Sequence, residues 1–596
     1  MSWLASTPMR AALYCCLLLA CIAPAYVLPN YPLFVLSLAI VNVIAVLGVN
    51  LVMGHAGQIV LGQAGFAAIG AYTTALLTMN VGVSYWLAMP IAALLAGIFG
   101  YVLGLPTLRL GPLYVSMVTF GFGLIVVLIL QNWYDLANGP NGMTVAPPSL
   151  FGYDLFPREF HIPIVLTAAA LFLLARNIVD AKHGRAFVAI RESEMAARAM
   201  GINLAHYKTT AFAIGAFYAG ISGALFAGLA QFVNPDAFVF PVSILYVTMA
   251  ILGGISTLAG AAIGGLMLTG LPELLRGAAE YKDFLTGLLL LLLLIFLPNG
   301  LLGLIRERVG KPGQTRGAVN STVAGGTLRP VAPPVQRTRT TQNVLQVADL
   351  SANFGGVKAL QNVTLALRAR EILAVIGPNG AGKTTLFNLI SGLYRPAQGR
   401  IFFEGRDITA IPAHSRARLG IARTFQNLDL FGEMTALDNV RVGAHTRMRS
   451  SLLQAAVRTR GERAEETRFR EVAMELLQFV GLTDYTYHPA KSLAFGHQRL
   501  LEIARALALA PKVLLLDEPA AGLNSSEIEF LIRLIRRVSE DSGISVLLIG
   551  HTMRLVMSSS DRVFVLDHGI PLAEGSPAAI QRDSRVIEAY LGADDA

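Results

Sequence analysis

Long apolar runs divided by short polar segments fill the first half of the chain, and this pattern predicts membrane-spanning helices. A helix needs about 20 apolar residues to cross roughly 30 Å of hydrocarbon, and most of the runs reach that length. Beyond residue 343 the pattern changes to short apolar strands alternating with helical stretches. The predicted membrane spans lie at residues 11–28, 33–53, 59–79, 86–105, 113–132 and 161–179, and three further apolar blocks lie at 209–232, 242–270 and 284–302.

These two patterns divide the 596 residues into two domains and a linker. We predict a polytopic α-helical membrane domain over residues 1–302 and an α/β domain over residues 343–596. Residues 303–342 between them are rich in glycine, proline, serine, threonine and arginine and show no apolar periodicity. This composition predicts a flexible, basic linker.

Charge is distributed as a membrane protein requires. Apolar residues make up 54% of the chain and charged residues only 14%, and no charged side chain occurs between Arg10 and Arg109. A soluble domain with so long an uncharged stretch would have no wettable surface, so we predict that lipid surrounds this half. The net charge of +9 raises nucleic acid as a partner. We predict no nucleic acid, because lysines and arginines gather in the predicted cytoplasmic loops and the linker, without a basic stripe interleaved with aromatic residues.

Uncharged polar side chains at membrane depth have two interpretations. They can line a passage for a polar solute, or they can hydrogen-bond between helices, and the second is favoured for any single residue. No carboxylate or lysine lies in the early spans, so coupling to protons or sodium has little to work with. The residues concerned are Asn42, Asn50, His55, Gln58, Gln63 and Gln131.

A phosphate-binding loop is the strongest motif of the second half. Residues 377–385 read GPNGAGKTT and fit G-x-x-x-x-G-K-[ST], between an apolar strand at 372–376 and a helical run. Glycines let backbone N–H groups curl around phosphate oxygens, Lys383 can bridge the outer phosphates, and the Thr384 hydroxyl can hold Mg²⁺. We therefore predict that ATP and Mg²⁺ bind here, through Gly377, Pro378, Asn379, Gly380, Ala381, Gly382, Lys383, Thr384 and Thr385.

Two carboxylates at the end of an apolar strand supply the rest of a hydrolytic site. Asp517 and Glu518 follow the strand at 513–516. Asp517 is placed to hold the Mg²⁺ shell, and Glu518 to orient or deprotonate the attacking water. A later apolar strand at 546–549 ends near His551, which can contact the γ-phosphate. Phe354 can stack on an adenine ring, with core packing as the alternative.

The ATP site decides on which side of the membrane the second half lies, since ATP is cytoplasmic. The hydrophilic segment at 182–208 carries five lysines and arginines, so this segment and the N-terminus are predicted to be cytoplasmic. The block at 242–270 must then supply an even number of crossings, as two spans or a re-entrant pair, and its glycines predict a break near Gly253-Gly254. Within the hydrophilic segment, the stretch from Glu192 to Met200 suits a short helix. It is either part of a solvated loop or a docking helix that receives motion from the ATPase.

The second half resembles the ATPase domain of ATP-binding cassette transporters. In this family two cassettes form a head-to-tail sandwich, with each ATP between one domain's phosphate loop and the other's signature segment. The resemblance assigns Gln426 to catalysis and to the Mg²⁺ ligands, beside the catalytic Glu518 and His551. The likeness covers about 250 residues and rests on GPNGAGKTT (377–385), Gln426, SLAFGHQRLLEIARAL (492–507), LLLDEP (514–519), AGLN (521–524) and His551. The signature contacts that it implies are Leu493, Ala494, Phe495, Gly496 and His497.

Both halves are similar to the branched-chain amino acid importers. The phrases ARTFQN, EIARAL, DEPAAGLN and VIEAYLG resemble their first ATPase subunit. Four segments of the first half resemble the second permease subunit of this family: GQAGFAAIGAY (62–72), LPTLRLGPLYVSMVTFGFG (105–123), GPNG (139–142) and GRAFVAIRESEMAARAMGI (184–202). Two subunits that are usually separate are therefore predicted to be fused.

The signature region departs from the general family pattern. Ala494 stands where serine is usual, His497 where glutamine is usual, and Asn524 where many cassettes have aspartate. The missing serine hydroxyl removes one hydrogen bond to phosphate, so we expect the ATP at this chain's signature to be held less tightly than the ATP at its own phosphate loop.

The resemblance implies an ATPase that couples hydrolysis to the uptake of branched-chain or other hydrophobic amino acids. One chain supplies one permease half and one cassette, so a second of each is expected, from distinct partner chains rather than another copy, with an extracytoplasmic solute-binding protein. The expected location is the bacterial inner membrane, multi-pass, with the ATPase domain and N-terminus cytoplasmic. The alternatives are an importer of urea or short amides, an exporter or flippase half, and an ATP-gated channel or regulatory membrane ATPase.

Overall fold

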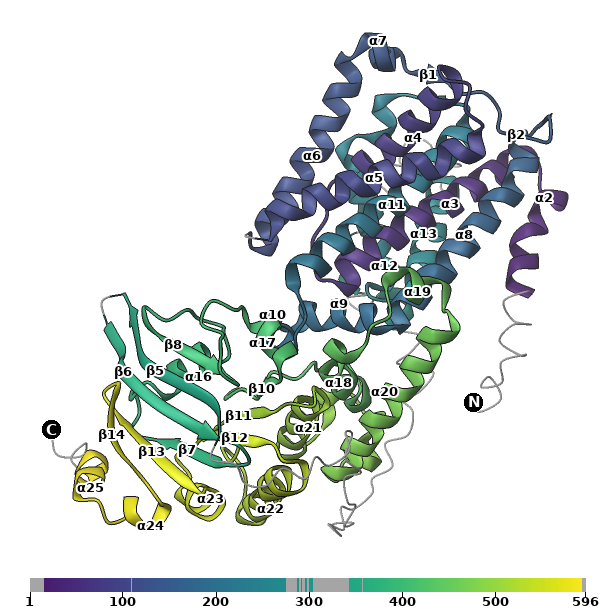
Figure 1. Ribbon diagram of the computed structural model, residues 1–596. Helices are drawn as coiled ribbons and strands as arrows, with labels where there is room; N and C mark the ends of the chain where they lie inside the picture. Colours follow the sequence, from purple (N-terminus) through teal and green to yellow (C-terminus); the bar gives the residue numbers. More distant parts are fainter. Residues whose placement is uncertain are drawn as a thin grey trace. The chain divides into compact units, whose positions relative to one another are not determined.

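The computed structural model of the chain describes residues 16–108, 110–274, 287–288, 291, 295–296, 300–303, 342–355 and 357–591. These residues form two compact units (Figure 1). The first unit comprises Met1–Arg191, Ala205–Ala318 and Ala455–Val457, and the second comprises Glu192–Leu204, Val319–Gln454 and Arg458–Ala596. The predicted linker at 303–342 lies almost wholly outside the described residues, as does most of the predicted span at 284–302.

Apolar helices make up the first unit, because in lipid an open chain satisfies its backbone hydrogen bonds only as a helix. Six of the described helices are long and apolar enough to cross a membrane. The predicted spans from 33–53 to 209–232 all fall on helices, although the one expected at 59–79 begins four residues late, after an irregular stretch. The apolar helices are α2 (Pro24–Val27), α3 (Asn30–Val49), α4 (Gln63–Met79), α5 (Tyr85–Thr107), α6 (Pro112–Asn132), α8 (Pro157–Asp180), α11 (Leu204–Ala230), α12 (Phe240–Gly254) and α13 (Leu258–Leu274), and the shorter α7 (Tyr134–Ala137) and α9 (Lys182–Glu192) lie between them.

Glycines allow α4 and α6 to approach closely. A Cβ atom on Gly62, which precedes α4, would lie 2.1 Å from the carbonyl oxygen of Thr119. One on Gly65 would lie 2.8 Å from the Cα of Gly123. Small residues are the means by which helices pack in lipid, where no hydrophobic effect drives their association, so these glycines serve packing.

Most of the polar side chains at membrane depth hydrogen-bond between segments, as the favoured interpretation predicts. Asn42 Nδ2 donates to Thr269 Oγ1 over 2.9 Å, and Gln63 Nε2 donates to the Gly215 carbonyl over 3.1 Å. Gln131 Nε2 contacts Asp236 at 3.3 Å. His55 and Gln58 differ, because their hydrogen bonds go to the Asn50 and Ala56 carbonyls of their own segment.

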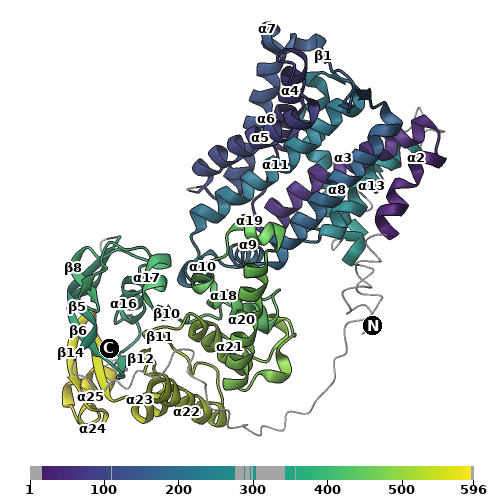
Figure 2. The same cartoon turned by 45° about the vertical axis from the view of Figure 1, so that its right-hand side comes forward.

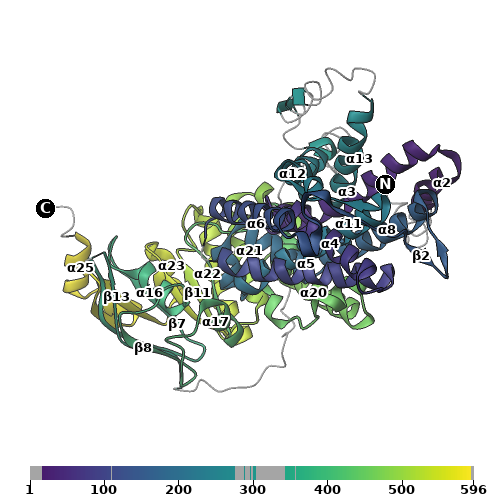
Figure 3. The same cartoon turned by 90° about the horizontal axis from the view of Figure 1, so that it is seen from above.

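The predicted break near Gly253-Gly254 is confirmed: α12 ends at Gly254 and α13 begins at Leu258. The two helices pack on each other and on α3 (Figure 3). The turn between them is held by one amide of the buried Asn50, at the end of α3. Asn50 Oδ1 accepts the Ser256 N–H and its Nδ2 donates to the Thr257 carbonyl, both over 2.8 Å. Arg191 Nη1 also donates to Ser256 Oγ, over 2.6 Å.

The short helix expected at 192–200 is α10 (Glu194–Ala199). It begins where Ser193 Oγ accepts the Ala196 N–H, and it is followed by Gly201 in the left-handed region, at φ +82°. Residues 192–204 belong to the second unit, in which α10 packs on α17 (Ala413–Leu419). In this unit the Glu192 carboxylate accepts the Glu433 N–H over 3.2 Å.

Two sheets form the scaffold of the second unit, as an α/β domain requires. The larger has the order β10-β11-β12-β7-β13-β14 and is parallel except for the β13–β14 pair, while the smaller, β6-β5-β8-β9, is antiparallel. All residues of β7, β11 and β12 are buried, which explains the apolar runs at 372–376, 513–516 and 546–549. The strands are β5 (Asn343–Phe354), β6 (Val357–Arg368), β7 (Ile372–Ile376), β8 (Gln398–Phe403), β9 (Arg406–Asp407), β10 (Ile421–Arg423), β11 (Val513–Asp517), β12 (Ser545–Ile549), β13 (Arg562–Asp567) and β14 (Ile570–Gly575).

Helices cover both faces of the larger sheet. One face packs on α16 (Lys383–Ile390) and the smaller sheet, and the other on a group of longer helices. Three of these, α18 (Ala436–Gly443), α20 (Arg460–Phe479) and α21 (Phe495–Ala508), pack on one another (Figure 2). The carboxyl ends of the parallel strands are left to carry chemistry, as open α/β sheets do.

Candidate functional site

The phosphate-loop motif lies between β7 and α16, as its sequence predicts. Gly377, Gly380 and Gly382 have φ values of +153°, +82° and +92°, a region that favours glycine. Lys383 is the first residue of α16, and its Nζ donates to the Gly377 and Pro378 carbonyls over 2.8 Å each. Burial lowers the pKa of the Lys383 ammonium, against the opposing effect of nearby carboxylates. The loop thus presents a helix N-terminus and a fixed cation, the combination that binds phosphate.

Asp517, the last residue of β11, has the chemistry of a magnesium ligand. Its side chain is fully buried, and its Oδ2 accepts Arg423 Nη2 over 2.9 Å. Its Oδ1 is buried and has no hydrogen-bond partner among the described residues. Burial raises the pKa of Asp517, and the Arg423 guanidinium opposes that rise. A carboxylate oxygen left without a partner, together with the hydroxyl of Thr384, fits Mg²⁺, which prefers oxygen ligands.

The three side chains predicted to be catalytic lie together. Gln426 Nε2 donates to Glu518 Oε2 over 3.2 Å, and His551 Nδ1 lies 3.5 Å from the same oxygen. Glu518 follows Asp517 directly and has a strained φ of +46°. Its side chain is 15% exposed, whereas that of His551 is 59% exposed. Glu518 is therefore held by two neighbours and still reached by solvent, as a base for water must be.

The signature segment forms the start of α21, separate in its contacts from the phosphate loop. The helix begins at Phe495, and Ala494 precedes it without a side-chain cap. A Cβ on Gly496 would lie 2.5 Å from Glu527 Oε1, and the His497 ring lies 4.7 Å from that of Tyr485. The described contacts of this segment are thus local. Its predicted contacts, which also include Leu493, would be with a nucleotide bound at the phosphate loop of a second cassette.

Asn524 caps the N-terminus of a helix, as an aspartate at this position could. It caps α22 (Ser525–Ser542), where its Oδ1 accepts the Glu527 N–H over 2.9 Å while Glu527 Oε2 accepts the Asn524 N–H over 2.9 Å. Both asparagine and aspartate cap helices well, so this departure from the family pattern preserves the local fold.

Phe354 has an aromatic neighbour that sequence reasoning missed. Its ring is 44% exposed and lies 5.4 Å from that of Tyr394, edge to face. Tyr394 comes from beyond α16 and shares no motif with Phe354, so only the fold brings the two together. Because the Phe354 ring is exposed, an adenine ring could reach it, and that contact stays a prediction.

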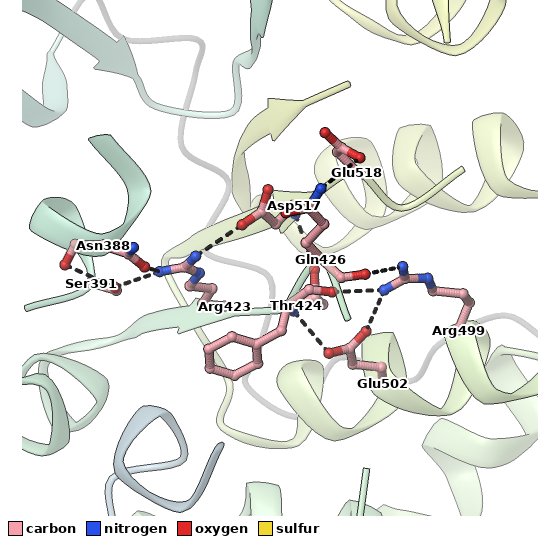
Figure 4. Close-up of polar contacts among 10 residues, drawn as sticks. Asn388, Ser391, Arg423, Thr424, Gln426, Arg499, Glu502, Asp517 and Glu518 are labelled. Atoms are coloured by element: carbon pink, nitrogen blue, oxygen red, sulfur yellow. Dashed lines mark hydrogen bonds and ion pairs between the residues drawn. The ribbon is translucent and has the colours of Figure 1, made fainter. Parts of the chain in front are cut away.

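A buried charged cluster connects α21 to the backbone around Gln426 (Figure 4). Glu502 Oε1 accepts the Phe425 N–H over 2.8 Å. Arg499 donates to the carbonyls of Phe425 and Gln426 and to Glu502 Oε2. Arg505 lies 3.7 Å from Glu502. Sequence reasoning missed this cluster, although its spacing of three residues places all three charges on one helical face among apolar neighbours.

Comparison with known proteins agrees with both halves of the chain. Residues 31–295 match the family described as branched-chain amino acid transport system / permease component, residues 360–521 match ABC transporter, and residues 571–596 match branched-chain amino acid ATP-binding cassette transporter. The ATP-binding protein BraF of Pseudomonas aeruginosa is 44% identical over 249 residues, covering 42% of this chain and 98% of BraF. The chain belongs to the branched-chain amino acid ABC transporter family.

Both components of the family are represented in the one polypeptide. The permease protein LivM of Escherichia coli (strain K12) is 36% identical over 308 residues, covering 47% of this chain and 72% of LivM. A solved nucleotide-free ATP-binding cassette from an ABC transporter is 32% identical, covers 42% of this chain and 99% of its own, and has a TM-score of 0.37. The matches to a permease family, to an ABC transporter family and to separate permease and ATP-binding proteins confirm the predicted fusion of permease and ATPase, and the second unit is an ATPase domain.

Proposed function

We propose that this chain couples ATP hydrolysis to the uptake of branched-chain amino acids, as the permease and the ATPase component of an importer. The observation that carries the proposal is the union, in one chain, of a permease match over residues 31–295 with a cassette in which Gln426 and His551 converge on Glu518. A permease of this family beside a cassette that brings Gln426, Glu518 and His551 together supports transport rather than regulation alone. It also disfavours the exporter alternative.

The proposed chemistry assigns one task to each side chain of the site. Lys383 and the N–H groups at the start of α16 hold the phosphates. Asp517, Thr384 and Gln426 would hold Mg²⁺, and the bound ion would neutralise charge on the phosphate oxygens. Glu518 Oε2 accepts a proton from the attacking water, and His551 and Gln426 keep that carboxylate in place.

We further propose that the assembly contains a second permease half and a second cassette, from distinct chains, with an extracytoplasmic solute-binding protein. This chain supplies one of each, and the relatives BraF and LivM are named as components of high-affinity transport systems. The proposed location is the bacterial inner membrane, with the ATPase and N-terminus cytoplasmic. The docking role of α10 is supported by its place in the second unit, where it packs on α17.

Uptake by the assembled system tests the solute. The full chain is reconstituted in vesicles with its partner permease, cassette and binding protein, and ATP-dependent accumulation of labelled leucine, isoleucine and valine is compared with that of urea and acetamide. We expect accumulation of the three amino acids, and no competition from a large excess of urea. Accumulation of urea or acetamide without amino acids would support the alternative importer and overturn this assignment.

A serine at position 494 should strengthen the signature segment. Ala494→Ser adds an N-cap hydroxyl to α21, which stabilises a helix start by about 1 kcal/mol, and it adds a donor to the phosphate that the segment is proposed to contact. We expect ATP to bind about 5- to 10-fold more tightly in the assembled system, as measured by titration with a fluorescent ATP analogue. Unchanged affinity and turnover would show that the signature does not limit nucleotide binding, and Ala510→Ser serves as the matched control.

A further inference from the structure

Arg423 is a buried cation in the cassette that the proposed hydrolysis does not use. It is the last residue of β10, and its side chain is 3% exposed. A fully charged guanidinium is seldom buried without a task, because removing it from water is costly. Its neighbour is Asp517 on the adjacent strand, the residue proposed to hold Mg²⁺.

The guanidinium joins two elements of the ATP site (Figure 4). Its Nη2 donates to Asp517 Oδ2 over 2.9 Å. Its Nη1 donates to Asn388 Oδ1 over 2.6 Å and to Ser391 Oγ over 3.0 Å, at the C-terminal end of α16. Because α16 begins at Lys383, the same side chain is fastened to the helix that carries the phosphate loop and to the carboxylate of β11.

Aromatic rings leave this side chain little freedom. The guanidinium carbon lies 5.7 Å from the centre of the Phe387 ring and 5.2 Å from that of Phe425. Both distances are within the range of cation–π attraction. Three hydrogen bonds and two aromatic rings therefore hold the Arg423 guanidinium in one orientation.

Rigid contact at one oxygen of Asp517 determines where the other oxygen lies. A carboxylate on a short side chain has only two torsions, so a hydrogen bond to Oδ2 also restricts Oδ1. Oδ1 is buried and has no partner among the described residues, which leaves it available to a ligand. Partners of this kind, which orient a metal ligand without touching the metal, typically contribute 10- to 100-fold in metal affinity.

We propose that Arg423 is a positioning residue for the metal–nucleotide complex. It fixes Asp517 through Oδ2 so that Oδ1 stays available to Mg²⁺, and it connects β11 to α16. The inference rests on the proposed role of Asp517 in holding Mg²⁺. Through its charge alone, a neighbouring cation would weaken Mg²⁺ binding, so orientation and charge predict opposite effects when Arg423 is replaced.

Two substitutions separate orientation from charge. Arg423→Lys keeps the charge but offers one ammonium point instead of a planar fork, so it cannot hold Asp517 and Asn388 together. Arg423→Met removes the charge as well. Orientation predicts that both variants lose Mg²⁺ affinity. Charge alone predicts little change in Arg423→Lys and tighter binding in Arg423→Met.

The experiment measures nucleotide binding rather than turnover. The purified full-length chain is titrated with trinitrophenyl-ATP in EDTA and across a series of free Mg²⁺ concentrations. We expect the half-saturating Mg²⁺ concentration to rise about 10- to 100-fold in Arg423→Lys and Arg423→Met, with affinity in EDTA unchanged. Asn388→Ala, which loosens Arg423 without touching Asp517, should show a smaller rise of several-fold. The exposed Arg406 supplies the control, since Arg406→Met should leave both quantities unchanged.

The Mg²⁺ dependence of nucleotide binding in these variants decides the inference. Unchanged Mg²⁺ dependence in Arg423→Lys, or tighter Mg²⁺ binding in Arg423→Met, overturns the inference. If Arg423→Met does not fold, Arg423→Lys and Asn388→Ala decide it, with thermal unfolding in EDTA as the check on their folding. Asp517→Asn separates the proposed role of Asp517 as a Mg²⁺ ligand from the positioning role of Arg423. If Asp517→Asn keeps the normal Mg²⁺ dependence of nucleotide binding, the proposed role of Asp517 in holding Mg²⁺ is wrong. If Asp517→Asn loses that dependence while the Arg423 variants keep it, only the positioning role of Arg423 is refuted.

Discussion

Replacement of Glu518 by glutamine should lower ATP turnover at least about 100-fold while leaving ATP binding intact. A positioned general base contributes roughly 10²- to 10⁴-fold to a rate, and a neutral amide cannot accept the proton of the attacking water. The substitution preserves size, so the contacts of Oε2 with Gln426 and His551 are retained in part. Phosphate release at saturating Mg·ATP measures turnover, and binding of trinitrophenyl-ATP measures affinity.

A matched control and the transport assay sharpen this prediction. Glu540→Gln changes an exposed carboxylate on α22, whose side chain is 64% exposed, and should leave turnover unchanged. In reconstituted vesicles, Glu518→Gln should abolish solute accumulation. Passive conduction that survives the substitution would instead favour an ATP-gated channel, and normal turnover in the variant would remove Glu518 from the catalytic group.

Replacement of Lys383 by alanine should weaken ATP binding about 10- to 150-fold and stop uptake. A hydrogen bond to a charged partner contributes about 1.5 to 3 kcal/mol, which corresponds to that range of affinity. The ammonium is held in place by two backbone carbonyls of the loop, so little mobility is lost when it meets phosphate. Titration with trinitrophenyl-ATP measures the effect, with the exposed Lys512 as the control in Lys512→Ala.

Uptake by the same variant tests the whole proposal. The assembled transporter containing Lys383→Ala is expected to accumulate no leucine against a gradient. Accumulation at the full rate would mean that hydrolysis at this cassette does not drive transport. The nucleotide titration then shows whether the variant still binds ATP or whether another cassette supplies the energy.

Local patterns predicted most of the fold and much of the site. The loop between β7 and α16 could be predicted because the motif G-x-x-x-x-G-K-[ST], set between a strand and a helix, is typical of phosphate-binding loops. The break at Gly254 could be predicted because glycines gather where a helix must stop. Asp517 and Glu518 could be placed at a strand end because an uninterrupted apolar run precedes them. For the phosphate loop and for Asp517 and Glu518 the necessary information lies in the neighbouring residues, whereas the break near Gly254 also required the number of crossings that a cytoplasmic ATP site implies.

Contacts across the sheet could not be predicted in this way. Arg423 meets Asp517 because β10 and β11 are neighbours, although 94 residues separate the two. The apolar strands have similar sequences, so their pattern reports burial but not order. The family resemblance placed Gln426 in the site, whereas Glu518 and His551 were predicted from the strands that precede them; that Gln426 and His551 both contact Glu518 was not predicted. That geometry required the fold.

The amide of Asn50 carries a consequence for how the protein is made. Its partners at Ser256 and Thr257 follow some 206 residues later in the chain. At about 5 to 20 residues per second, a ribosome needs on the order of 10 to 40 s to reach them. During that interval α3 is already synthesised with an unsatisfied polar group, which hydrocarbon penalises by several kcal/mol. The contacts of Asn50 therefore form only after α12 and α13 have been synthesised, so the hairpin between these two helices closes late in the assembly of the membrane unit.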